Sequence, residues 1–236
     1  MNLIKANERL IVALDVSTSE EAKIIVEKLG DAVSFYKIGI ILQMGAGLEL
    51  VDWLIKRNKK VFLDLKYCDV EDTIREAVKR VAETGAAFLT VHGNGKIIEA
   101  AVEGRGKSPL KIFTVTVLTS FDAFDIKDMG FPCSVSDLVI YRAKKTIEAG
   151  GDGVISSALE AKSIRKAAGD KLLIITPGIR PEGANVDDHK RCATPAQAIK
   201  NGADYLVVGR PIIKAENPRE VAEKIIEEIE TTIQIF

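Results

Sequence analysis

The sequence predicts an α/β protein folded as a closed (β/α)8 barrel, and three observations support this. The chain has 236 residues, 47% hydrophobic and 28% charged, which is enough for a full core, and α/β barrels of about this length form one domain. Short β-branched runs alternate with segments of helical spacing along the whole chain. No Pro/Gly/Ser-rich linker divides it, so we expect a single domain over residues 1–236.

Eight runs rich in Val, Ile, Leu and Phe are expected to be strands. They cover residues 9–16, 34–40, 60–67, 87–93, 111–118, 152–157, 172–179 and 204–212.

Segments between these runs, and one after the last, have apolar residues three and four positions apart, and several end in glycine, as helices do. The expected helices cover residues 17–30, 47–58, 70–85, 95–104, 135–150, 158–169, 194–202 and 217–234. Strict alternation implies a parallel sheet, and eight units favour a closed barrel over the alternative, an open Rossmann-like sheet. No G-x-G-x-x-G follows the first strand, where "ALDVSTSEEA" stands instead, so dinucleotide binding is not expected.

Composition excludes several classes of function. Lys+Arg 33 against Asp+Glu 34 gives a net charge of −1 without a basic stripe, so no nucleic-acid partner is expected. No segment approaches the ~18 apolar residues of a membrane span, and no export signal is seen. The three cysteines, Cys68, Cys133 and Cys192, lack metal-ligand spacing and suit a reducing cytoplasm. Cys68 is interpreted as a small filler and not as a nucleophile.

Charged residues gather where the first three strands end. Asp15 ends the first strand, Lys37 lies in the second, Asp64 and Lys66 lie in the third, and Asp69 follows it. Side chains two apart on a strand share a face, so Asp64 and Lys66 should point the same way. A structural salt bridge is the usual explanation of any single pair, but five charges at the carboxyl ends of barrel strands favour an active site.

The signs of these charges narrow the chemistry. Three carboxylates alone would resemble a divalent metal site, but Lys37 and Lys66 interleave with them, so no metal is expected. A lysine between carboxylates is stabilised as an ammonium ion, which makes it a proton donor and not a Schiff-base nucleophile.

The last two strands predict an anion site. "TPGIRP" and "VVGRPI" bring Gly178, Arg180, Gly209 and Arg210 to the place where barrels commonly bind phosphate. The polar segment 181–193 between them has the composition of a lid loop.

At this point the sequence resembles a known family. "LDLKYCDVEDT" is similar to the D-x-K-x-x-D signature of the orotidine 5′-phosphate decarboxylase family, and "ALDV", "YKIG", "TVHG", "TVLTS", "TPGIRP", "TPAQAI" and "VVGRP" resemble its other blocks in order. Related barrels with this signature, 3-keto-gulonate-6-phosphate decarboxylase and hexulose-6-phosphate synthase, use a metal and carry an acidic residue on the second strand. This chain has Lys37 there.

The resemblance implies decarboxylation of orotidine 5′-monophosphate to uridine 5′-monophosphate, the last step of de novo pyrimidine synthesis. It further implies a TIM barrel without a cofactor, acting as a cytoplasmic homodimer with shared active sites. It also implies a role for each site residue. At the reacting end, Asp64 lies against the substrate carboxylate, Lys66 protonates the pyrimidine carbon, and Lys37 joins the charged array. The other implied roles are binding of the ribose hydroxyls by Asp15 and Lys37, of the pyrimidine by Thr119, and of the phosphate by Arg180, Gly209 and Arg210, whereas Asp69 and Thr73 reach the partner subunit's site.

The chain departs from the family pattern at two positions. Glu71 replaces a usual proline, and an acid is favourable in the first turn of a helix. His189 replaces the phosphate-loop glutamine, so His189 is either a phosphate contact or an exposed loop residue without a role. Two other functions stay open: a catalytically silent phosphosugar-binding barrel, and a metal-dependent aldolase or decarboxylase.

Overall fold

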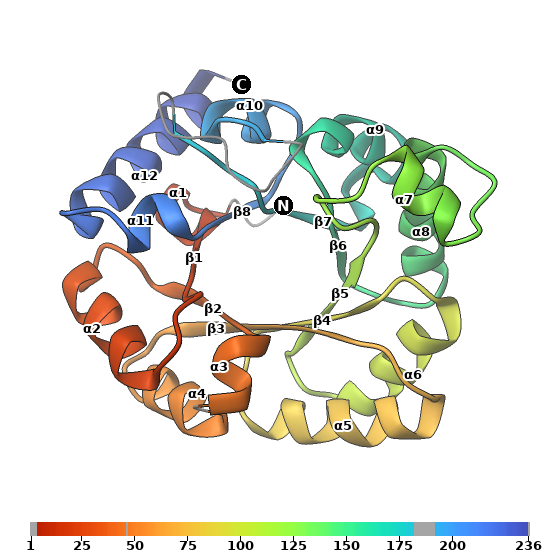
Figure 1. Cartoon of the computed structure of the whole chain (residues 1–236), viewed down its shortest axis with the longest axis horizontal. Coiled ribbons are helices and arrows are strands. Elements are labelled where there is room, and N and C mark those ends of the chain that lie inside the picture. Colours follow the sequence, from red (N-terminus) through yellow and green to blue (C-terminus); the bar gives the residue numbers. More distant parts are fainter. Residues whose placement is uncertain (1–3, 46, 182–191, 236) are drawn as a thin grey trace.

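The computed structural model of the chain describes residues 4–45, 47–181 and 192–235. Eight parallel strands form a closed barrel, in which β8 pairs with β1 (Figure 1). The strands are β1 (Leu10–Ala13), β2 (Phe35–Gly39), β3 (Lys60–Tyr67), β4 (Phe88–His92), β5 (Lys111–Val115), β6 (Gly153–Ile155), β7 (Leu173–Thr176) and β8 (Tyr205–Val208). The predicted (β/α)8 fold is confirmed.

Helices surround the barrel, and each of the eight expected helices is present. They are α2 (Ser19–Leu29), α4 (Gly47–Ile55), α5 (Glu71–Glu83), α6 (Gly95–Arg105), α8 (Val135–Glu148), α9 (Ala158–Ala168), α10 (Pro195–Lys200) and α12 (Pro218–Ile235). Short helices that the sequence analysis did not predict are α1 (Ala6–Arg9), α3 (Ile40–Gly45), α7 (Ala123–Asp128), η1 (Gly169–Lys171) and α11 (Arg210–Ile213). Within the part of the chain that the structure describes, none of these helices has the length and apolar character needed to cross a bilayer.

The prediction that the eighth strand continues to residue 212 is wrong. The strand ends at Val208, and Gly209 is the N-cap of α11 with φ −109° and ψ −102°. Pro211 lies in the first turn of that helix, where its missing N–H is not needed. The chain therefore turns at Gly209 and starts a helix with Arg210 at the mouth of the barrel.

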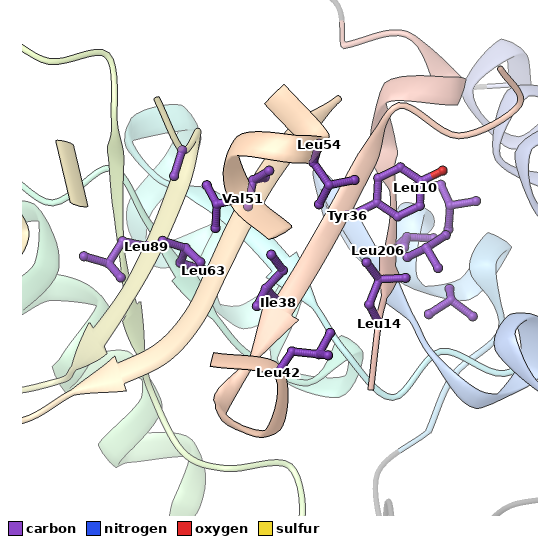
Figure 2. Packing of buried hydrophobic residues seen from close by; sticks show 14 of the residues in the cluster. Leu10, Leu14, Tyr36, Ile38, Leu42, Val51, Leu54, Leu63, Leu89 and Leu206 are labelled. Carbon is purple, nitrogen blue, oxygen red and sulfur yellow. The ribbon is translucent and has the colours of Figure 1, made fainter. Parts of the chain in front are cut away.

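Alternate strand residues face the helices or the inside of the barrel, as the two-residue period of a strand requires. The larger core lies between the sheet and the helices. It contains Leu10, Tyr36, Leu63, Leu89 and Leu206, all at most 1% exposed, packed against apolar residues of the covering helices (Figure 2).

The inside of the barrel is filled by aromatic rings. Phe35, Phe62, Phe88 and Phe113 come from four consecutive strands, and the Phe88 ring centroid lies 4.8 Å from that of Phe35 and 4.6 Å from that of Phe113. Gly153 leaves room for this packing, because an added Cβ there would lie 2.5 Å from Cε1 of Phe113. The rings fill the barrel beneath the carboxyl ends of the strands.

Two similar ion pairs anchor the other end of the barrel. Asp152, just before β6, pairs with Arg105 of α6 and accepts a backbone N–H of β5 at 2.9 Å. Asp204, just before β8, accepts from Arg165 Nη2 of α9 at 2.7 Å and from a backbone N–H of β7 at 2.8 Å. Each aspartate ties one helix to two neighbouring strands, far from the carboxyl ends.

Candidate active site

A cavity of about 400 Å³ opens at the carboxyl ends of the strands. Phe62 of the aromatic layer lies at its base, and Val115 and Ile155 give it an apolar wall. Most of the predicted site residues line it: Asp15, Lys37, Asp64, Lys66, Thr119, Arg180, Gly209 and Arg210.

On one side of the cavity, charges of opposite sign alternate. Lys37 Nζ lies 2.9 Å from Asp15 Oδ1 and 3.6 Å from Asp64 Oδ2, and Lys66 Nζ lies 2.9 Å from Asp64 Oδ1. The central Lys37 and Asp64 side chains are 9% and 14% exposed, whereas Lys66 and Asp15 are 29% and 47% exposed. The network is formally neutral, and both of its ends, Asp15 and Lys66, are partly exposed and line the cavity.

A repeated sequence pattern explains where these side chains lie. Each of the four inward-facing phenylalanines is followed two residues later by the next inward-facing residue, in "FYK", "FLD", "FLT" and "FTV". The layer above the aromatic rings therefore holds Lys37, Asp64, Thr90 and Val115. Sequence analysis did not single out Thr90, although this pattern is the signal that identifies it.

Asp64 remains ionised despite its surroundings. Burial alone would raise the pKa of its carboxyl, but the positive charges of Lys37 and Lys66, with hydrogen bonds from Lys66 and Thr90, outweigh burial and hold the pKa below its usual value. Asp64 is thus a fixed negative charge between two ammonium groups at neutral pH.

Asp64 and Lys66 meet as predicted, but simple strand alternation does not bring them together. The pairing of β3 with β4 shifts register between Leu63 and Tyr67, and Lys66 has a φ of +52°. This left-handed conformation costs an L-residue about 1–2 kcal/mol. The lysine that faces the cavity therefore sits on a strained bulge, a common feature beside active sites.

A glycine leaves space for the Asp15–Lys37 pair. A Cβ added at Gly39 would lie 3.2 Å from Lys37 Nζ and 3.4 Å from Asp15 Oδ1. The "YKIG" of β2 therefore supplies both the buried ammonium and the room for it.

The β7 and β8 side of the cavity carries the arginines. Arg180 is only 7% exposed, and its Nη1 donates to the carbonyl of Ile179 at 2.9 Å. No carboxylate among the described residues lies within 4.0 Å of this guanidinium. Gly178 has φ +76° and lines the cavity. Arg210, the first residue of α11, also lines the cavity. A buried guanidinium that has no carboxylate partner among the described residues suits an anionic ligand.

Two predicted residues, Asp69 and Thr73, do not line this cavity. Asp69 and Thr73 are exposed, and the Asp69 side chain accepts the backbone N–H of Val70 at 2.7 Å. His189 and most of the expected lid loop lie outside the described residues. Across the described ranges, no three His, Cys, Asp or Glu side chains are grouped so as to hold a metal ion.

Comparison with known sequences gives this site its family. The sequence profile described as "Orotidine 5'-phosphate decarboxylase / HUMPS family" matches residues 8–225. The chain belongs to this family. The resemblance seen in the sequence is thereby confirmed.

Relatives within the family share nearly the whole chain. An orotidine 5′-phosphate decarboxylase of Nitrobacter winogradskyi is 55% identical over 224 residues, covering 95% of this chain and 93% of that protein. One of Methylococcus capsulatus is 51% identical over 223 residues, covering 94% and 91%. The crystal structure of orotidine 5′-phosphate decarboxylase from Lactobacillus acidophilus superposes with a TM-score of 0.83 at 35% identity, covering 93% of this chain and 98% of that one.

Proposed function

We propose that this chain decarboxylates orotidine 5′-monophosphate to uridine 5′-monophosphate, the last step of pyrimidine biosynthesis, without a cofactor. Its family relatives support the reaction. The observation that supports the mechanism is the Lys66 ammonium, 2.9 Å from Asp64, on the wall of a cavity whose other side carries arginines. In the ring of Figure 1, β3 lies across from β7, so one nucleotide can place its pyrimidine carboxylate near β3 and its phosphate near β7.

The proposed chemistry follows from what decarboxylation requires. When the carbon–carbon bond to the carboxylate breaks, carbon dioxide leaves and the electron pair stays on the pyrimidine carbon. The ammonium of Lys66 stabilises this pair as it develops and then transfers a proton to the carbon. Neutral Lys66 regains its proton from solvent after release, so one proton is consumed for each carbon dioxide formed.

Asp64 and Lys37 prepare the site for this step. Asp64 carries a fixed negative charge, so it crowds a substrate carboxylate placed beside Lys66, and this repulsion is relieved as neutral carbon dioxide departs. Lys37, held between Asp15 and Asp64, keeps the array ordered. In this proposal Asp15 and Lys37 bind the ribose hydroxyls.

The remaining cavity residues are proposed to hold the rest of the nucleotide. Arg180, Arg210 and the backbone at Gly209 bind the phosphate, for which a buried guanidinium is well suited. Thr119, 9% exposed after β5, contacts the pyrimidine. Binding energy at the remote phosphate then helps to order the reacting end.

We further propose that the enzyme is a homodimer in which Asp69 and Thr73 complete the site of the partner subunit. Both are exposed in the single chain and lie outside its own cavity. Apolar side chains are exposed at the same end of the barrel, with Val70 68%, Met44 84% and Ile41 61% exposed. Exposed apolar groups of this kind favour a protein contact.

The experiment is a spectroscopic assay with the purified chain. Orotidine 5′-monophosphate is added without metal, with and without a chelator, and the ultraviolet change of the pyrimidine is followed. We expect turnover that survives the chelator. Activity lost to the chelator and restored by Mg²⁺ would instead support the metal-dependent branch of the family, and nucleotide binding without turnover would support a silent binding barrel.

Lys66→Ala tests the mechanism in the same assay. We expect turnover to be lost while the fold and the affinity for uridine 5′-monophosphate are kept, because the ammonium acts on the reacting carbon. Activity within about tenfold of the wild type, or ~1.4 kcal/mol, would remove Lys66 from the chemistry.

A further inference from the structure

Thr90 lies in the middle of β4, is 0% exposed and does not line the cavity. Its hydroxyl nevertheless lies between the two groups on which the proposed chemistry depends. Thr90 Oγ1 accepts the backbone N–H of Lys66 at 2.9 Å and donates to Asp64 Oδ1 at 3.0 Å.

Chemistry fixes the direction of these two hydrogen bonds. The Lys66 N–H can only donate, and an ionised carboxylate can only accept. The single hydroxyl proton of Thr90 therefore has to point at Asp64, while a lone pair receives Lys66. One buried side chain thus links the backbone of the proton donor to the carboxylate beside it.

The bond to Lys66 is made where the strand is irregular. Among described residues other than glycine, only Asn58 and Lys66 have positive φ, and asparagine tolerates this conformation better than lysine does. The register of β3 against β4 is broken between Leu63 and Tyr67, so the side chain of Thr90 takes the Lys66 N–H within that gap. The Thr90 hydroxyl thus accepts the Lys66 N–H at the point where the regular pairing of β3 with β4 is interrupted.

The bond to Asp64 fixes the carboxylate. Oδ1 receives both Lys66 Nζ at 2.9 Å and the Thr90 hydroxyl, so Oδ2 is left directed at Lys37, 3.6 Å away. Rotation of the carboxylate would break one of these contacts. The order of the charged array along the cavity wall therefore depends on a residue that does not itself line the cavity.

We propose that Thr90 is a positioning residue for the decarboxylation, holding the Lys66 backbone on its bulge and the Asp64 carboxylate in register with both lysines. This inference deepens the proposed function and rests on it. Thr90 acts through Asp64 and Lys66, so its loss should affect the chemical step and leave ligand binding nearly unchanged.

The test compares Thr90→Val, which keeps the shape and removes the hydroxyl, with Thr90→Ser, which keeps the hydroxyl. We expect Thr90→Val to lower kcat about 10- to 100-fold, the range for losing one hydrogen bond to a charged group, with KM within about threefold. Thr90→Ser should return kcat to within about threefold of the wild type. Thr114→Val is the matched control: Thr114 is equally buried on β5, and its hydroxyl has no hydrogen-bond partner in the described part of the chain. Its kcat should not change.

The outcomes separate this inference from the function on which it rests. A wild-type protein that does not decarboxylate the substrate overturns both. A wild-type protein that turns over normally while Thr90→Val stays within threefold of it, or while Thr90→Ser is as impaired as Thr90→Val, overturns the role of Thr90 alone. Should Thr90→Val unfold below the assay temperature, Thr90→Ala against Thr90→Ser makes the same comparison, with the same outcomes.

Discussion

Replacing Lys37 by methionine tests whether the charge array is an interdependent unit. The substitution keeps most of the side-chain volume and removes one buried ammonium, 2.9 Å from Asp15 and 3.6 Å from Asp64. Removing one partner of a buried ion pair costs about 3–5 kcal/mol. Here Asp15 is 47% exposed and can be rehydrated, and Asp64 keeps Lys66, so we expect about 2–3 kcal/mol. At about 2–4 °C per kcal/mol for a chain of this size, Tm should fall by about 4–12 °C.

The pH dependence of kcat and of Tm in Lys37→Met gives a second test of the charge array. Among the influences that lower the pKa of Asp64 against its burial, the charge of Lys37 is the largest, so this pKa should rise in the variant. The acid limb of kcat should therefore move to higher pH. Because the folded-state pKa of Asp64 lies below its unfolded value, ionised Asp64 contributes stability above about pH 4 and loses that contribution as pH falls through the folded pKa. The Tm difference between variant and wild type should thus narrow below about pH 4.

Lys60→Met is the matched control, measured by thermal unfolding and by kcat against pH. Lys60 pairs with Glu8 at 2.8 Å, nearly the Lys37–Asp15 distance, but these side chains are 49% and 36% exposed. Solvent screening reduces such a pair to about 0–1 kcal/mol, so its Tm should fall by at most about 4 °C. If Lys37→Met lowers Tm no more than Lys60→Met and leaves the acid limb in place, the array is not coupled as described.

Three further predictions concern the partner subunit, the phosphate and the barrel base. Mixing inactive Lys66→Ala and Asp69→Ala proteins should restore some activity, because heterodimers contain one intact site; no recovery despite proven subunit exchange would place both residues in one chain's site. Arg180→Ala should raise KM for the nucleotide about 10-fold or more and leave turnover of the phosphate-free nucleoside unchanged; an equal loss on both substrates would contradict phosphate binding. Asp204→Ala should lower the free energy of unfolding, measured with denaturant, by about 2–4 kcal/mol and leave kcat unchanged, because Asp204 anchors the end of the barrel away from the site. A loss of kcat without destabilisation would contradict this.

Sequence periodicity alone was sufficient to predict the barrel and the positions of its eight main helices. Each element carries its own local signal, a strand period or a helical spacing, and strict alternation leaves few topologies. The errors occur where a few residues decide the conformation. Gly209 and Pro211 end β8 and start a helix within an apolar run, and the run after Gly39 becomes α3 instead of a loop. Short apolar segments of this kind fit either structure until tertiary contacts select one.

The site was predictable to the extent that it depends on which residue follows which strand. Asp15, Lys37, Asp64 and Lys66 converge because parallel strands end at one rim, and a sequence shows which charges are there. Asp69 was expected at this rim by the same argument, but it does not line the cavity of its own chain. The position of a residue after a strand predicts that it lies at the rim, but it does not predict which cavity its side chain faces.

The bulge at Lys66 shows what such rules leave out. Alternation predicts that Asp64 and Lys66 share a face, and a regular strand would satisfy that prediction with the lysine backbone paired to β4. The structure instead gives Lys66 a φ of +52° and directs its N–H to the Thr90 side chain. No local feature of "DLK" signals this, because the partner of the Lys66 N–H is a hydroxyl on the next strand, 24 residues later. The backbone of the proposed proton donor thus depends on a long-range hydrogen bond as well as on its own strand. Its geometry should accordingly be more sensitive to Thr90 than to the solvent-exposed residues that follow Lys66 in sequence.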